Sequence, residues 1–318
     1  MKYTENALNI LVAKSFRNIG AQKIVDNIRG AEDVAIIVRK LSRFSAEMTI
    51  MEFQKRKEQL RNVFENSDLC ADGAVAWGDE NFPQVRGNVE ASKQPICLFY
   101  RGNFELLNFE NPCAAVIGLL TPDINIEKRE AKVVSELVKK NITIVSGLAL
   151  GCDTIAHRTA LKFGGKTIAV LPSPLNNILP KENKKLAEDI VNSGGLLISE
   201  YYEDFSSVME LRGRYEMRDR LQALFSNVVI LAASYAQSDK GKDSGSRFAM
   251  RDALKYNIKR AIIYNNDMDK DNPMYNLSRQ VLQDNDKIII INGKTLESSI
   301  SEIAKVKPHT FSQQTLLF

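Results

Sequence analysis

The segment 146–154 contains residue types that could hold an anion. It reads Ser-Gly-Leu-Ala-Leu-Gly-Cys-Asp-Thr and is followed by a helical pattern. Glycines permit a tight turn close to a ligand, and the start of a helix offers unpaired backbone amides at the positive end of its dipole. Ser146, Gly147 and Gly151 are therefore candidate phosphate-binding residues. On spacing alone, a glycine turn that only packs the strand against the helix is an equally good interpretation.

A second loop of this kind occurs later in the chain. Ser244, Gly245 and Ser246 precede a helical pattern that starts near Arg247. A serine at the start of a helix is first of all a capping residue. Two such loops at one edge of a sheet nevertheless favour an anion site more than either does alone, so these four residues are also candidates.

Between the two loops, the segment 212–220 carries four arginines in nine residues. On a helix, Arg218 and Arg220 cannot face the same way. One of them could reach a ligand while the other forms an ion pair with Glu216 or Asp219. A solvated charged helix face is the competing interpretation.

Other chemistries find no support in the sequence. The glycine spacing is neither G-x-G-x-x-G nor a Walker A loop, so we expect no nucleotide cofactor. The four cysteines are not at metal-ligand spacing, and there are only two histidines, so we expect no metal site. His157 has no nucleophile in a strained turn beside it, and no paired carboxylates form a hydrolase pattern. The sequence therefore predicts a protein that is not an enzyme.

The elements that would position these residues follow an alternating rhythm. Apolar, β-rich runs occur at 114–119, 142–146, 167–172, 196–199, 228–233, 260–264 and 287–291. Helical patterns separate most of them, at 127–140, 154–163, 181–193, 216–225 and 247–256. Continuous apolar strands with helical crossovers predict an α/β fold, a doubly wound, mostly parallel Rossmann-like sheet. Such sheets bind ligands at the carboxyl ends of their strands, where both glycine loops would lie.

The rest of the chain suggests four parts. We expect a small N-terminal helical domain at 1–68, a connector at 69–111 that packs on the main domain, the Rossmann-like domain at 112–304 and a flexible tail at 305–318. The net charge of +4 neither proves nor opposes a nucleic-acid partner. With no signal-peptide pattern and no apolar run long enough to span a bilayer, we expect a cytoplasmic protein without membrane contact.

An ordered series of motifs resembles the DNA-processing protein A (Smf) family. The matching segments lie in register between residues 75 and 265, at 78–83, 100–103, 146–161, 164–171, 180–183, 197–200, 218–221 and 244–246. The series is far more specific than any single motif. The resemblance implies a homodimer that binds single-stranded DNA in a basic pocket of a Rossmann-like domain and hands the strand to a RecA-type recombinase, in recombination, transformation or DNA handling. Phosphate contacts would make such binding sensitive to salt.

The sequence also departs from the family pattern. Leu120 and Leu150 stand where the family has arginines, and Asp219 replaces an asparagine. The resemblance therefore implies a reshaped pocket. We expect compensating phosphate contacts from other basic residues, namely Lys166, Arg218, Arg220 and Arg247.

The chain ends in Gln314-Thr315-Leu316-Leu317-Phe318. This peptide resembles the short bacterial motif that binds the DNA sliding clamp. Leu316, Leu317 and Phe318 could enter a hydrophobic groove while Gln314 hydrogen-bonds at its rim. The alternative is a tail that folds back on its own domain.

Two other functions remain open. Relatives of this family also serve in anti-phage and toxin–antitoxin loci, so a regulatory, antitoxin-like module with a toxin partner is one alternative. A nucleotide-processing enzyme is the other. A co-purifying partner or turnover of nucleoside monophosphates would distinguish them.

Overall fold

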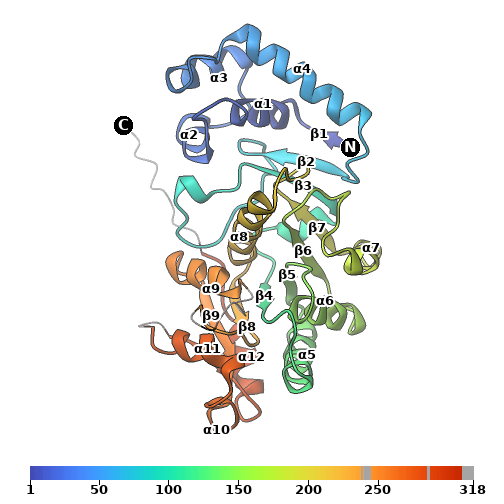
Figure 1. Cartoon of the computed structure of the whole chain (residues 1–318), viewed down its shortest axis with the longest axis vertical. Coiled ribbons are helices and arrows are strands. Elements are labelled where there is room, and N and C mark those ends of the chain that lie inside the picture. Colours follow the sequence, from blue (N-terminus) through green and yellow to red (C-terminus); the bar gives the residue numbers. More distant parts are fainter. Residues whose placement is uncertain (238, 240–244, 285–286, 310–318) are drawn as a thin grey trace.

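The computed structural model describes residues 1–237, 239, 245–284 and 287–309. Ser244 and the predicted clamp-binding residues Gln314, Leu316, Leu317 and Phe318 lie outside these ranges. The described residues form one mixed sheet with helices on both faces and a group of helices at one end (Figure 1).

The sheet has ten strands in the order β1-β2-β3-β7-β6-β5-β4-β8-β9-β10. Their bounds are β1 (Lys2–Tyr3), β2 (Gly73–Ala76), β3 (Cys97–Gly102), β4 (Cys113–Ile117), β5 (Thr143–Ser146), β6 (Thr167–Leu171), β7 (Leu196–Ser199), β8 (Val228–Leu231), β9 (Lys259–Ile263) and β10 (Ile289–Ile291). Strands β4 to β10 run parallel, whereas β3 is antiparallel to both β2 and β7. The predicted doubly wound, mostly parallel fold is confirmed.

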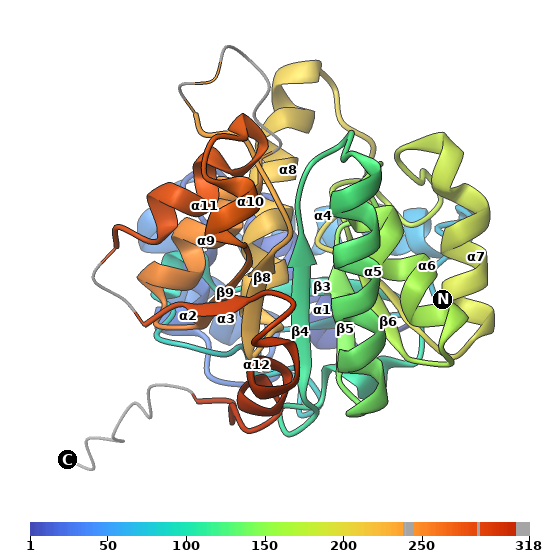
Figure 2. The same ribbon diagram turned by 90° about the horizontal axis from the view of Figure 1, so that it is seen from below.

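Helices follow most of the parallel strands, because parallel neighbours need a crossover connection. They are α5 (Ile124–Lys139), α6 (Cys152–Lys162), α7 (Lys184–Asn192), α8 (Val208–Leu224), α9 (Ser246–Lys255), α10 (Asn266–Asp269), α11 (Asn276–Val281) and α12 (Leu296–Ile303). Figure 2 shows α5, α6 and α7 on one side of the central strands and α8 and α9 on the other.

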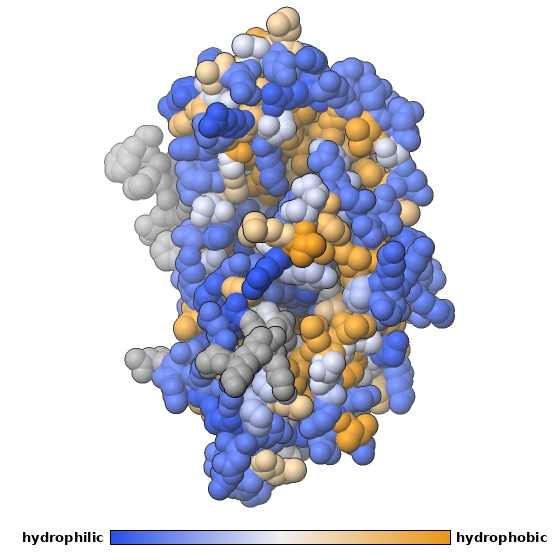
Figure 3. All heavy atoms as spheres, in the orientation of Figure 1, coloured by the Kyte–Doolittle hydropathy of each residue, from blue (hydrophilic) through white to orange (hydrophobic). Residues whose placement is uncertain are grey.

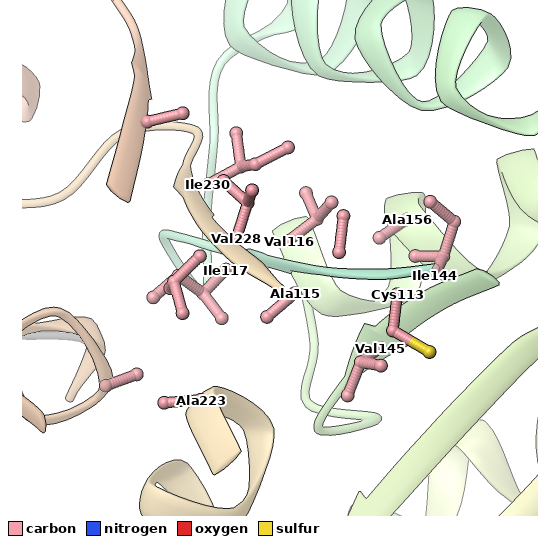
Figure 4. Close-up of a cluster of buried hydrophobic side chains, with 14 of the residues drawn as sticks. Cys113, Ala115, Val116, Ile117, Ile144, Val145, Ala156, Ala223, Val228 and Ile230 are labelled. Carbon is pink, nitrogen blue, oxygen red and sulfur yellow. The ribbon is translucent and has the colours of Figure 1, made fainter. Parts of the chain in front are cut away.

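The central strands alternate their side chains between these two layers. In Figure 4, Val116 points to the side where Ala156 of α6 lies, whereas Ala115 and Ile117 point to the side of Ala223 in α8. All five of these side chains are buried, which accounts for the continuous apolar strands in the sequence. The sheet is thus fixed at its centre, next to the loops that follow β4 and β5.

The N-terminal helices α1 (Glu5–Lys14), α2 (Ala21–Asn27), α3 (Val34–Leu41) and α4 (Ile50–Asn66) gather at the β1 end of the sheet (Figure 1). One apolar cluster joins these helices to residues of β2, β3, β6 and β7. The expected connector also contributes β2 and β3 to the sheet. The division at residues 68 and 111 therefore stays a prediction.

The segment expected as a free tail from residue 305 begins with packed residues, which corrects that expectation. Val306 packs against the main core, and its carbonyl accepts a hydrogen bond from Asn227 Nδ2 at 3.1 Å. The carbonyl of His309 accepts one from the Gly87 amide at 2.7 Å. Among the described helices, none is long and apolar enough to cross a membrane.

Candidate nucleic-acid interface

A cavity of about 440 Å³ opens at the carboxyl edge of the sheet. It lies where the loops after β4 and β5 meet α8 and the start of α9. In the sheet, β4 has β5, the next strand along the chain, on one side and β8 on the other. The order of the strands therefore reverses at β4. Ligands of open parallel sheets bind at such a reversal. Figure 3 views this face, and hydrophobic and hydrophilic residues lie close together around the hollow in its middle.

The glycine loop after β5 is shaped by contacts inside the protein. Gly151 has a φ of +73°, and a Cβ there would collide with the backbone of Leu119 and Leu120. The amides of Gly147 and Ala149 both donate to Asp153 Oδ2, at 3.2 Å each. These amides are therefore already hydrogen-bonded within the loop. Gly151 brings the two loops together, which supports the packing interpretation of this position.

Ser146 takes no direct part in the cavity. Its side chain is fully buried, and its hydroxyl donates to the carbonyl of Val116 at 2.7 Å. This bond ties the end of β5 to β4. The predicted direct phosphate contact is therefore replaced by a positioning role.

Arg218 lies beneath the glycine loop between two carboxylates. Its Nη1 is 3.2 Å from Asp153 Oδ2, and its Nε is 3.3 Å from Asp219 Oδ1. Burial alone would lower the pKa of Arg218, but Asp219 and Asp153 outweigh burial and raise it. Burial raises the pKa of Asp219 to about 7, although Arg218 opposes the shift. The inner end of the cavity thus holds a buried Asp–Arg–Asp group.

Arg220 and Lys166 lie away from this cavity. Arg220 is on the opposite face of α8, where it pairs with Glu200 Oε2 at 2.5 Å and donates to the Lys93 carbonyl. Lys166 precedes β6, so it lies at the amino edge of the sheet, and it donates to the Ser193 carbonyl at 2.7 Å. Of the two arginines, only Arg218 reaches the cavity. The expected ion-pair partners were wrong for the other one, because Arg220 pairs with Glu200 and it is Arg218 that pairs with Asp219. Lys166 cannot join Arg218 at the cavity.

The second loop does meet the first. Gly245 precedes α9 with a left-handed φ of +77°, and Ser246 Oγ donates to the Gly118 carbonyl at 3.1 Å. Ser246 therefore links the start of α9 to the end of β4. Arg247 is half-buried beside the cavity, 4.2 Å from the ring centroid of Phe248, and burial lowers its pKa. The structure brings Gly245, Ser246 and Arg247 to the same cavity as Arg218.

The outer wall contains the two leucines that depart from the family pattern, together with residues that sequence reasoning did not single out. Leu120 and Leu150 line it and are 50% and 44% exposed. Tyr215 and Phe248 add partly exposed aromatic rings, and Arg212 adds an exposed cation. A helical projection from Arg218 would have found Tyr215 three residues before it and Gln222 four after, on the same face of α8. Phe248 would have been found as the residue that directly follows Arg247 in the sequence.

Cys152 and His157, a potential nucleophile and a potential base, are both buried nearby. Burial raises the pKa of the Cys152 thiol well above its usual value, and it lowers the pKa of His157 to about 4. His157 Nδ1 lies 2.7 Å from Thr167 Oγ1. Neither group is therefore prepared for catalysis at neutral pH. In the part of the chain that the structure describes, no three His, Cys, Asp or Glu side chains are grouped to hold a metal ion.

Known proteins match this chain in sequence and structure. The family model for DNA recombination-mediator protein A matches residues 73–298. The DNA processing protein DprA of Streptococcus pneumoniae is 39% identical over 144 residues, which cover 45% of this chain and 49% of the relative. The chain therefore spans about half the length of this curated relative.

Two solved structures share the fold. The X-ray structure of the S. pneumoniae DprA has a TM-score of 0.68 and 25% identity and covers 93% of this chain and 98% of its own. DNA processing protein A from Helicobacter pylori, whose structure is described for its unique single-stranded DNA binding mode, has a TM-score of 0.55 and 27% identity. It covers 72% of this chain and 99% of its own.

Proposed function

The chain belongs to the DNA recombination-mediator protein A family, and from that premise we propose that it binds single-stranded DNA at the carboxyl edge of its sheet. The single observation that carries the proposal is the composition of the cavity rim. Arg212 and Arg247 are cations there, and Tyr215 and Phe248 are aromatic rings. Arginines that attract the backbone and rings that stack on bases are the two features of sites for single strands.

We infer a role in recombination, transformation or DNA handling, without catalysis. The relatives described above are DNA-processing proteins, and they favour this role over the antitoxin-like and nucleotide-processing alternatives. The buried Cys152 and His157 support a function in binding, because neither group is available for chemistry. A RecA-type recombinase, a sliding clamp and a second copy of the chain are partners that we propose from the resemblance. The proposed location is the cytoplasm, where such DNA is handled.

Fluorescence anisotropy with a labelled oligothymidine tests the proposal. We expect binding at low salt that weakens as salt rises, because each phosphate contact releases counterions. Replacing Arg212 or Arg247 with alanine should weaken binding and reduce the slope of log K against log salt by about 0.7 per lost contact. The matched control is Arg39→Ala. Arg39 is an exposed arginine of α3, which lies at the β1 end of the sheet and not at the cavity. Absence of binding at low salt would refute the proposal.

A further inference from the structure

We propose that the groove between α2 and the segment 85–94 binds the chain's own residues 310–318. The anchors of this segment are Leu316, Leu317 and Phe318, which lie outside the described residues. The groove shares no lining residue with the cavity at the carboxyl edge of the sheet. The inference therefore does not depend on the DNA binding proposed above, and each can fail without the other.

The groove has a volume of about 810 Å³ and lies between the N-terminal helices and the connector. Helix α2 packs there against the single-turn helix Ala91–Lys93. The apolar residues that line the groove are Val25, Trp77, Val85, Val89 and Ala91. All of them except the buried Val85 are partly exposed. Three charged residues also line the groove, and all three are exposed to water: Asp26, Arg29 and Glu90. The groove thus offers apolar surface that an uncharged, apolar segment can cover.

The described chain already reaches this groove at Gly87, which is one of the lining residues. The Gly87 amide donates to the carbonyl of His309 at 2.7 Å. The amides on either side of it, those of Arg86 and Asn88, donate to carbonyls at the carboxyl ends of α8 and α9. Gly87 has a φ of +83°, and a Cβ there would collide with the carbonyl at the end of α9. This position therefore requires glycine, and its amide holds the chain beside the groove just before residue 310.

Residues 310–318 suit this groove in length and in chemistry. They read Thr-Phe-Ser-Gln-Gln-Thr-Leu-Leu-Phe and include four large apolar side chains but no charged one. Nine extended residues span at most about 30 Å, so from His309 the segment can cross a groove of this size. Because the segment is tethered beside the groove, its effective concentration there is about millimolar, as for other short linkers. A free partner must exceed that concentration or bind more tightly to replace it.

Docking in the groove and binding to the sliding clamp exclude each other, because both use Leu317 and Phe318. A clamp must therefore displace the segment from α2 and from the connector before it can bind. The groove gives these apolar side chains a partner on their own chain in the absence of a clamp.

The fluorescence of Trp77 tests the proposal, since it is the only tryptophan of the sequence and lines the groove. Acrylamide quenching is measured on the full chain, on the double variant Leu317→Ala/Phe318→Ala and on the control Ser312→Ala. We expect stronger quenching and a red-shifted emission in the double variant, because its groove is open to water, and wild-type behaviour in the control.

A synthetic peptide of residues 310–318 provides the rescue. At about millimolar concentration it should restore wild-type quenching in the double variant, and the same peptide with both alanines should not. Equal quenching of wild type and double variant, or no effect of the peptide on the double variant, would overturn the inference.

Photocrosslinking locates the segment on the molecule. With Phe318→p-benzoylphenylalanine in the full chain, we expect a crosslink at the mass of one chain, to α2 or to the segment 85–94. The control carries the same photoreactive group at Val208, which is 83% exposed on α8 and does not line the groove, and it should leave the groove unlabelled. A crosslink from position 318 to another part of the chain, or to a second copy, would overturn the assignment.

Discussion

The Arg218 guanidinium lies directly against Gly147, so that a methyl group at position 147 would overlap Arg218 Nη1. Asp153 contacts both residues, because its Oδ2 accepts from the Gly147 amide and from Arg218, at 3.2 Å each. The glycine thus leaves room for the buried arginine. The shape of the loop and the charge beneath it depend on each other.

Gly147→Ala tests this relationship. The added methyl must displace Arg218 from its two carboxylates, and we expect the free energy of unfolding to fall by roughly 1.5–3 kcal/mol, the scale of a lost charge-assisted hydrogen bond. Urea unfolding measures the change. The control is Gly213→Ala in α8, where a Cβ meets nothing within 4 Å, and which should stabilise by roughly 0.5–1 kcal/mol. Similar effects at both glycines would contradict the account.

Restoring the family arginines should strengthen DNA binding. Leu120 and Leu150 are exposed at the rim, so Leu120→Arg and Leu150→Arg add cations without disturbing the core. Each should tighten oligothymidine binding roughly tenfold at low salt and steepen the salt dependence by about 0.7. Leu282→Arg, a partly exposed leucine outside the cavity lining, is the matched control. Affinities unchanged relative to that control would show that the strand passes elsewhere.

Asp219 predicts a dependence of stability on pH. Its pKa is raised from 3.8 to about 7 in the folded protein, chiefly by burial, so the folded state favours the protonated acid. The stability that this group contributes is present below about pH 4 and is lost as pH rises through about 7. The free energy of unfolding of the wild type, minus that of Asp219→Asn, should therefore decrease between about pH 4 and pH 7, by at most about 1.4 kcal/mol per pH unit. Above about pH 7 this difference should be constant. Urea unfolding over a pH series measures the difference. An increase of this difference with pH would mean that the ion pair with Arg218, and not burial, determines the pKa of Asp219.

The C-terminal peptide predicts a partner. Leu317 and Phe318, which lie outside the described residues, would fill an apolar groove on a sliding clamp. Replacing both with alanine should abolish pull-down of the clamp, whereas Ser312→Ala should retain it. If the wild-type protein does not bind the clamp, or if the doubly substituted protein still does, the C-terminal peptide is not a clamp-binding segment.

The fold was largely predictable because its parallel strands are buried on both faces. Each apolar run from β4 to β10 stands out in the sequence, as does a helical pattern before or after each strand from β4 to β9. The helices α10, α11 and α12 on either side of β10 were not predicted. Strands β1 and β2 were missed. Lys2–Tyr3 and the segment Gly73–Ala76 are short, and they become strands only through pairing with neighbours distant in sequence.

The site was predictable in place but not in detail. The glycine loops indicated the carboxyl edge of the sheet. The sequence could not show that Asp153 occupies the loop amides or that Asp219 pairs with Arg218, because both contacts depend on how α8 packs over the sheet. Lys166 was misplaced for a simpler reason: it precedes its strand, and only residues that follow a strand reach the carboxyl edge.

A structure of the chain with a short oligothymidine would show where the single strand binds. We expect the strand to lie across the opening formed by the loops after β4 and β5 and by α8 and α9, with phosphates near Arg212 and Arg247. A strand bound elsewhere on the molecule, with this cavity empty, would contradict it.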